Sequence, residues 1–348
     1  MKKIHIGHHF FGSGNFGDDL MLAGFLEQAK CYNIQYTCCV PYPLEALEVR
    51  FPQINWLPYS YEARASAIKD CDVWLGLGGS AFQNSVSQWF TDHLDEETTL
   101  CRKFKKPIYF LGIGGQDHTA FSDERLKSII RLSESVWVRD KNLYNQLISN
   151  DLLDYDKVHN AADLAHIFFK IHVKRQIKQD SIGTILNFDY KTWPSLSDTL
   201  NSIKALNLRE HYWLIQEKRP LPGSEKQLYQ TLTSDQQAIW KHTEWDNSES
   251  HVLNAFNRWP SPEFILTSRF HATLASAWSG TRIVVLAINL KLQSAAEDFG
   301  IESLRLDTHP HDIIQALREA QPIPLDILGA KAALAENSVN DFFSSIGL

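Results

Sequence analysis

The sequence predicts an α/β protein with two Rossmann-like domains that face each other across a cleft. The chain has 348 residues, and at about 150 residues per domain this length favours two domains. Short apolar runs alternate with longer stretches of helical periodicity, and several of the runs end in glycine. This alternation is typical of parallel sheets covered by helices, which bind ligands at the carboxyl ends of their strands.

The apolar runs predict strands in both halves of the chain. Helical periodicity begins at Asp18, just after the first run, and a closing helix or two is predicted from residue 325. A polar stretch at 174–180 separates the halves. We therefore expect an N-terminal Rossmann-like domain at 1–175, a C-terminal one at 176–325 and a helical tail at 326–348. The predicted strands are 4–10, 34–40, 73–77, 108–113, 136–138, 182–186, 212–215, 264–267 and 283–286.

Composition and charge exclude several classes of protein. Hydrophobic residues make up 44% of the chain and charged residues 22%, the balance of a soluble globular protein. A net charge of −7 argues against a general nucleic-acid binder, which needs a basic surface. The five cysteines include no CxxC pair, so neither a disulfide framework nor a zinc site is predicted. His5, His8 and His9 alternate along the first strand without partner carboxylates, and we predict no metal there.

Two further observations bear on location. No apolar run reaches the roughly 20 residues that span a bilayer. Residues 1–6 are typical of a first strand and not of a signal peptide. We therefore expect a cytoplasmic protein.

The first glycine loop, at 12–17, fits the G-x-G-x-x-G pattern of dinucleotide sites between a strand and a helix. Two features oppose a nicotinamide cofactor. The ribose-binding acid expected about 20 residues further on is missing. Asp18 and Asp19 place carboxylates where a pyrophosphate would dock. These acids are therefore either helix caps or groups that face a hydroxyl or a proton donor.

Two more glycine loops, at 76–80 and 112–115, each follow a predicted strand. Glycine there lets backbone N–H groups approach an anion or a sugar closely. Gly79, Ser80, Gly114 and Gly115 are accordingly candidate substrate-binding residues. For either loop taken alone, a tight turn between strand and helix is the favoured interpretation.

The most informative segment is 264–280, where a buried strand runs into a helix of small residues that ends at Gly280. Arg269 and His271 stand at the turn. A cation at a helix N-terminus opposes the macrodipole, and an anionic ligand would relieve that conflict. His271 could exchange a proton near neutral pH. Arg139, at the end of another strand, is followed by Asp140, which can cap the next helix. In both places the alternative is an ordinary surface charge.

Taken together, these segments resemble the polysaccharide pyruvyl transferase family over nearly the whole chain. The resemblance implies a GT-B-like glycosyltransferase architecture. It also implies transfer of the pyruvyl or enolpyruvyl group from phosphoenolpyruvate to saccharide hydroxyls, usually as a ketal, with no metal or organic cofactor. The matching pieces are Asn15-Phe-Gly-Asp18, the loops 76–80 and 112–115, Val138-Arg-Asp140, Ala162-Asp163, Ser268-Arg-Phe-His-Ala272, Gly280 and Lys291.

The resemblance also assigns roles. Phosphoenolpyruvate carries a phosphate and a carboxylate, so its site needs at least two strong cationic donors. These would be Arg139 and Arg269, with the backbone of Phe270 assisting and Lys291 adding positive charge. His271 is then the general acid, and Asp18 is the base or the group that orients the acceptor. We expect four residues, Asp18, Arg139, Arg269 and His271, to converge within about 10 Å of one point across the cleft, about the size of the ligand.

Departures from the family pattern leave the acceptor open. Gly-Gly-Ser-Ala at 78–81 lacks a third glycine, Gln116 stands where the family often has proline, and Leu164 stands where proline is common. One alternative is a nucleotide-sugar glycosyltransferase, because the fold and the Arg-x-His-Ala helix start also occur among such enzymes. Another is a catalytically silent binding protein of a glycan cluster. A lipid-linked acceptor would bring the protein transiently to the inner membrane face. The sequence does not determine the oligomeric state.

Overall fold

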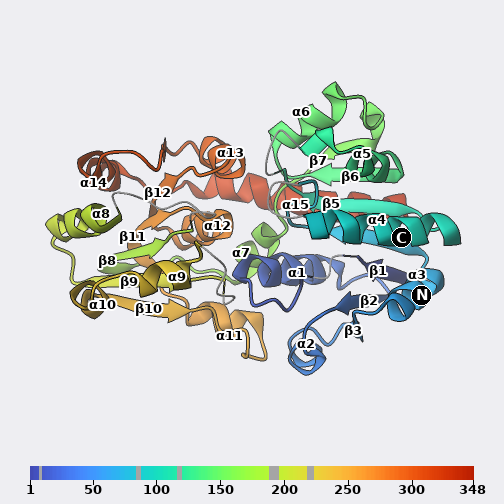
Figure 1. Ribbon diagram of the computed structural model, residues 1–348, viewed down its shortest axis with the longest axis horizontal. Coiled ribbons are helices and arrows are strands. Elements are labelled where there is room, and N and C mark those ends of the chain that lie inside the picture. The colour runs from blue at the N-terminus through green and yellow to red at the C-terminus, as the bar shows by residue number, and fades with distance from the viewer. Residues whose placement is uncertain (8–9, 84–87, 116–119, 188–195, 218–222) are drawn as a thin grey trace. The chain divides into compact units, whose positions relative to one another are not determined.

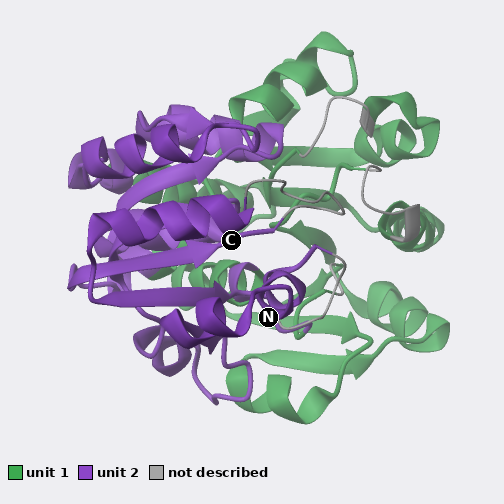
Figure 2. Cartoon of the chain, turned by 60° about the vertical axis from the view of Figure 1, so that its left-hand side comes forward, with its two compact units in different colours: residues 1–12, 18–168, 330–348 green, residues 13–17, 169–329 purple. Residues whose placement is uncertain are grey.

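The computed structural model describes residues 1–7, 10–83, 88–115, 120–187, 196–217 and 223–348 (Figure 1). These residues form two compact units, shown in different colours in Figure 2. Unit 1 comprises 1–12, 18–168 and 330–348, and unit 2 comprises 13–17 and 169–329. The division thus lies at 168/169, where we expected 175/176, and the C-terminal residues from 330 onward belong to unit 1. Within the described part of the chain, no helix is both long and apolar enough to cross a membrane.

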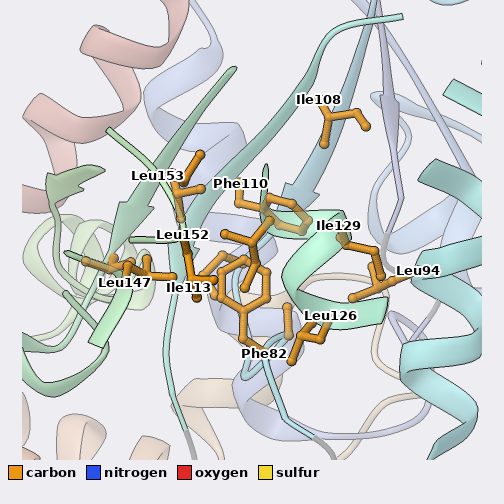
Figure 3. Packing of buried hydrophobic residues seen from close by; sticks show 14 of the residues in the cluster. Phe82, Leu94, Ile108, Phe110, Ile113, Leu126, Ile129, Leu147, Leu152 and Leu153 are labelled. Atoms are coloured by element: carbon orange, nitrogen blue, oxygen red, sulfur yellow. The ribbon is translucent and has the colours of Figure 1, made fainter. Parts of the chain in front are cut away.

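Unit 1 contains a parallel sheet of seven strands in the order β3-β2-β1-β4-β5-β6-β7. Every residue of β4 and β5 is buried, because helices cover both faces of the central strands. Figure 3 shows the part of the core that includes Phe82, Phe110 and Ile113. The strands are β1 (Lys2–Ile6), β2 (Ile34–Val40), β3 (Ile54–Pro58), β4 (Val73–Leu77), β5 (Ile108–Ile113), β6 (Ser133–Val138) and β7 (Val158–Asn160).

The helices of unit 1 alternate with its strands along the chain, and α15 is added from the C-terminal end. Helices α1, α7 and α15 each cross the division between the units, so their other ends belong to unit 2. The helices are α1 (Phe16–Ala29), α2 (Leu44–Arg50), α3 (Tyr61–Asp70), α4 (Gln88–Phe104), α5 (Glu124–Arg131), α6 (Lys141–Ser149), α7 (Ala165–His172) and α15 (Leu325–Ser345), with short 3₁₀ turns η1 (Ala120–Ser122) and η2 (Tyr155–Lys157).

Unit 2 contains a second parallel sheet, with six strands in the order β10-β9-β8-β11-β12-β13. Its core includes Trp213 and Trp240, both fully buried. The strands are β8 (Lys178–Ile185), β9 (Glu210–Ile215), β10 (Trp240–Glu244), β11 (Pro262–Thr267), β12 (Arg282–Leu286) and β13 (Ser303–Leu304). The helices are α8 (Leu196–Ile203), α9 (Glu225–Gln230), α10 (Ser234–Ile239), α11 (Val252–Asn257), α12 (Phe270–Ser279), α13 (Leu290–Phe299) and α14 (Pro310–Glu319), with η3 (Lys204–Leu206).

The predicted fold class of two Rossmann-like α/β domains is confirmed, and the strands predicted at 34–40, 73–77 and 108–113 match to the residue. The first strand is shorter than predicted and ends at Ile6. Gly7 then packs against the ring of Trp74, where an added Cβ would lie 2.0 Å from the indole. His8 and His9 lie outside the described residues. The prediction that His5 lacks a partner carboxylate is wrong, since Glu97 Oε1 lies 4.0 Å from its Nε2.

Candidate functional site

The predicted site residues fall into two groups, one in each unit, and each group is described by itself. Unit 2 holds the group around the start of α12. Unit 1 holds the glycine loops at 76–80 and 112–115, Arg139, and Asp18 of α1. The unit 2 residues are Arg269, Phe270, His271 and Lys291, and the unit 1 residues are Asp18, Gly79, Ser80, Gly114, Gly115 and Arg139.

Arg269 follows β11 and is the N-cap residue of α12. Its backbone N–H donates to Thr267 Oγ1 at 3.0 Å, and its carbonyl accepts from the Thr273 N–H at 3.0 Å. The guanidinium donates from Nε and Nη2 to the two carboxylate oxygens of Glu225, at 2.5 and 3.0 Å. We expected a bound anion to relieve the conflict between this cation and the helix N-terminus. The chain itself provides a carboxylate there.

Glu225 is the first residue of α9 and is completely buried. Its carbonyl accepts a hydrogen bond of 2.8 Å from Nε1 of Trp213, a core residue of β9. Burial raises the pKa of the Glu225 carboxyl, and the positive charge of Arg269 opposes that shift. The buried carboxylate and the guanidinium thus depend on each other, because a buried charge without a partner is costly.

His271 is the second residue of α12 and is buried. Its ring meets that of Phe270 edge to face, with the centroids 5.2 Å apart. Lys291 Nζ lies 4.7 Å from the Phe270 ring centroid, within the range of a cation–π contact. The structure therefore brings Lys291, Phe270 and His271 together at the start of α12, and their roles in binding and catalysis stay predictions.

Residues 13–17, which include the first two residues of α1, belong to unit 2 and reach the imidazole of His271. The Phe16 N–H donates to the Gln216 carbonyl at 3.0 Å, and Asn15 Nδ2 donates to Glu217 Oε2 at 2.9 Å. Asn15 Oδ1 in turn accepts from the Gly17 N–H at 2.9 Å. A Cβ added to Gly17 would lie 1.9 Å from His271 Nδ1. Only glycine therefore fits at position 17 while the imidazole keeps its place.

In unit 1, Arg139 is buried, with 2% of its side chain exposed. It forms a hydrogen-bonded ion pair with Asp163, and its Nη2 lies 3.5 Å from Ser80 Oγ. A Cβ on Gly114 would lie 2.3 Å from Arg139 Nε, so this glycine lets the backbone approach the guanidinium. Three separate loops thus meet at Arg139, Ser80 and Gly114. Asp163 offsets the positive charge of Arg139.

Backbone N–H groups of the glycine loop at 112–115 donate hydrogen bonds within unit 1. The Gly114 N–H donates to the Gly79 carbonyl at 2.8 Å, and the Gly115 N–H donates to Asp140 Oδ2 at 2.8 Å. Asp140 also caps α6 by accepting from the Leu143 N–H at 2.7 Å, which confirms its predicted capping role. The binding of substrate by Gly79, Ser80, Gly114 and Gly115 stays a prediction.

The two acids at the start of α1 have different surroundings. Asp18 is half-buried in the first turn of the helix. Asp19 is buried and forms an ion pair of 2.9 Å with Arg50, the last residue of α2. Asp19 is therefore a structural residue that fastens α2 to α1, and Asp18 remains the candidate for chemistry.

Sequence reasoning did not identify Glu217 or Glu225 as neighbours of the candidate residues. The segment Ser224-Glu-Lys-Gln227 carries a helix-start signal, and Ser224 does cap α9. That signal predicts where the helix begins. It does not predict that the first helical residue, Glu225, pairs with Arg269. The pairing depends on β9 and β11 both flanking β8, which sequence periodicity does not reveal.

Several solved structures resemble the chain over its full length. UDP-GlcNAc 2-epimerase from Methanocaldococcus jannaschii is 13% identical, with a TM-score of 0.64 and coverage of 99% of this chain and 100% of that one. A UDP co-structure of Staphylococcus aureus MnaA is 11% identical, with a TM-score of 0.67 and coverage of 99% and 96%. At such low identity the likeness shows the fold alone, a GT-B-like pair of Rossmann-like units. No curated protein matches the sequence.

A model of the polysaccharide pyruvyl transferase family matches residues 15–289. The matched range begins at Asn15 and contains every candidate residue except Lys291, which lies two positions beyond its end. It includes both glycine loops, the Arg139 strand end and the whole of α12. The chain therefore belongs to the polysaccharide pyruvyl transferase family and is a transferase.

Proposed function

We propose that the protein transfers the pyruvyl group of phosphoenolpyruvate to hydroxyls of a saccharide and closes it as a ketal. The observation that carries this proposal is the family match over 15–289, which contains the Arg-Phe-His segment at the start of α12. The proposal requires no metal or organic cofactor. The cytoplasm is the compartment that we propose for the reaction, at the inner membrane face when the acceptor is lipid-linked.

The reaction forms two carbon–oxygen bonds at the same carbon, first by addition and then by substitution of the phosphate. In the first, the methylene of phosphoenolpyruvate takes a proton, a sugar oxygen bonds to the central carbon, and the hydroxyl loses its proton. In the second, a neighbouring hydroxyl bonds to that carbon and loses its proton, while the bond to phosphate breaks. The products are the ketal and inorganic phosphate. The enzyme must therefore supply a proton donor, a proton acceptor and positive charge beside the phosphate.

In unit 2, His271 is the proposed proton donor to the methylene. Arg269 and Lys291, which flank the start of α12, are the proposed cations for the phosphate or the carboxylate of the donor. Backbone N–H groups at a helix N-terminus add to the attraction for an anion. Arg269 is the more exposed member of its pair with Glu225, at 18% against 0%. A ligand can therefore approach the guanidinium and not the carboxylate.

In unit 1, Arg139 is the second proposed arginine for the donor, and Asp18 is the proposed base or acceptor-orienting group. Arg139 is paired with Asp163 and held against Gly114 and Ser80, so its guanidinium has a fixed orientation. A preoriented guanidinium suits the recognition of phosphate and carboxylate oxygens.

The test is phosphate release from phosphoenolpyruvate against a panel of saccharides, with wild type, His271→Ala and His311→Ala. His311 is a matched control, because its side chain is 78% exposed beside Asp312 and lies outside the proposed machinery. We expect release that depends on the acceptor, falls by about 10²- to 10⁴-fold in the His271 variant and persists in the control. No release with any acceptor, together with no calorimetric binding of phosphoenolpyruvate, would refute the proposal. Nucleotide sugars would then be tried, because the alternative is a glycosyltransferase.

A further inference from the structure

The charged pair between Arg269 and Glu225 has an asymmetric environment within unit 2. Glu225 is completely buried, whereas 18% of the Arg269 side chain is exposed. The guanidinium uses its Nε and Nη2 edge for the pair, and both carboxylate oxygens accept, at 2.5 and 3.0 Å. Such a two-point contact fixes the plane of the guanidinium as well as its position.

The backbone of Glu225 is itself fixed. Its carbonyl accepts from Trp213 Nε1 at 2.8 Å, and that indole belongs to the core of unit 2. Ser224 caps the same helix by accepting from the Gln227 N–H. The backbone that carries the carboxylate is therefore held by the core of unit 2, and the carboxylate in turn holds the Arg269 guanidinium.

We propose that Glu225 is a positioning residue, which orients the Arg269 guanidinium so that it binds the phosphate or carboxylate of phosphoenolpyruvate. This inference rests on the proposed function. Without the carboxylate, the long arginine side chain regains rotational freedom and loses the orientation that two-point recognition of an oxyanion needs. Both carboxylate oxygens of Glu225 accept from Arg269, so Glu225 acts through the arginine.

The decisive variant is Glu225→Gln, which keeps the size of the side chain and removes its charge. We expect the KM for phosphoenolpyruvate, and its Kd by calorimetry, to rise by about 10- to 100-fold. The KM for the saccharide should stay unchanged. A merely structural role would lower the amount of folded enzyme without separating the two KM values. Glu249→Gln is the matched control, because Glu249 pairs with Arg258 at 2.8 Å in the same unit and is not a proposed site residue.

If the glutamine variant does not fold, which circular dichroism reports, Glu225→Asp decides the matter. Aspartate keeps the charge that Arg269 needs but draws the guanidinium back by one carbon–carbon bond. The expected result is again a raised KM for phosphoenolpyruvate alone. A folded variant of either kind with both KM values of the wild type overturns the positioning role. Failure of the proposed function is distinguishable, because the wild type itself then binds no phosphoenolpyruvate and releases no phosphate.

Discussion

Gly17 lies against the imidazole of His271, and a Cβ at this position would be 1.9 Å from Nδ1 and 2.4 Å from Cγ. In Gly17→Ala either the ring or the start of α1 must move. We expect activity to fall by about 100-fold, because a displacement of about 1 Å at a reacting group costs that much. The measurement is the rate of phosphate release at saturating substrates.

Gly329→Ala is the control for that substitution. Gly329 lies in α15, and an added Cβ there meets nothing within 4 Å. This variant should keep full activity and gain up to about 1 kcal/mol of stability, because alanine is the better helix former. Wild-type activity in Gly17→Ala would contradict the placement of His271.

At the residue scale, sequence reasoning identified the candidate site residues but not the side chains that pair with them. Sequence reasoning could identify three of the candidates because a charged or titratable side chain directly after a buried strand is unusual without a ligand or partner. These are Arg139, Arg269 and His271. Asp163 was singled out only as part of the family resemblance, and Glu225 is an ordinary acid in the sequence. Only the paired strands and the loops after them bring each acid to its arginine, and that information is not local.

At the scale of elements, α15 shows how a terminal helix contributes to a core far from it in sequence. Phe342 is fully buried and meets the rings of Tyr109 and Trp137 edge to face, at 5.6 and 6.0 Å. We expect Phe342→Ala to lower the free energy of unfolding by about 3–5 kcal/mol. Denaturant unfolding followed by tryptophan fluorescence measures this.

Leu325→Ala is the control within the same helix, because Leu325 is 55% exposed. Its effect should stay within about 0.5 kcal/mol. A loss in Phe342→Ala no larger than in this control would show that α15 does not pack as described.

The elements themselves were more predictable than their ends. Strands β4 and β5 are buried along their whole length and were located to the residue. Strand β2 was also located to the residue, because Pro41 ends its run. The shorter strands β7 and β13 have too few residues for a pattern. Strand β10, Trp-Lys-His-Thr-Glu, lies at a sheet edge and is mostly polar, so it could not be predicted from an apolar run.

At the scale of the whole molecule, stability should depend on pH through a buried network in unit 1. Glu97 accepts from Trp74 Nε1 at 2.8 Å and lies 3.7 Å from His93 Nε2 and 4.0 Å from His5 Nε2. Burial opposes its charge, but the two histidines and the indole outweigh burial and lower the pKa of Glu97 to about 2. Burial also lowers the pKa of His93.

The lowered pKa values of Glu97 and His93 both make the fold less stable as the pH falls. A carboxylate with a lowered pKa stabilises the fold fully above its unfolded pKa, here about 4.5, and loses that contribution as the pH falls toward 2. A shift of this size corresponds to about 3 kcal/mol. His93 adds to the loss below its ordinary pKa of about 6.5. We therefore expect stability to fall steadily below neutral pH.

Urea unfolding between pH 7 and pH 3, compared for wild type and Glu97→Gln, measures the part due to Glu97. The variant should be less stable at pH 7 and should lose less stability on acidification. Glu48→Gln, at an exposed position, should follow the wild type. Parallel pH profiles for wild type and Glu97→Gln would contradict the role of the network.

Pyruvyl transfer is tested most sharply by the mass of the saccharide after incubation with the protein and phosphoenolpyruvate. We expect an accepted saccharide to gain the mass of one pyruvate less one water, with one phosphate released for each ketal formed. His271→Ala should yield neither product. Phosphate release without any change in the mass of the saccharide would contradict pyruvyl transfer, because the protein would then only hydrolyse phosphoenolpyruvate.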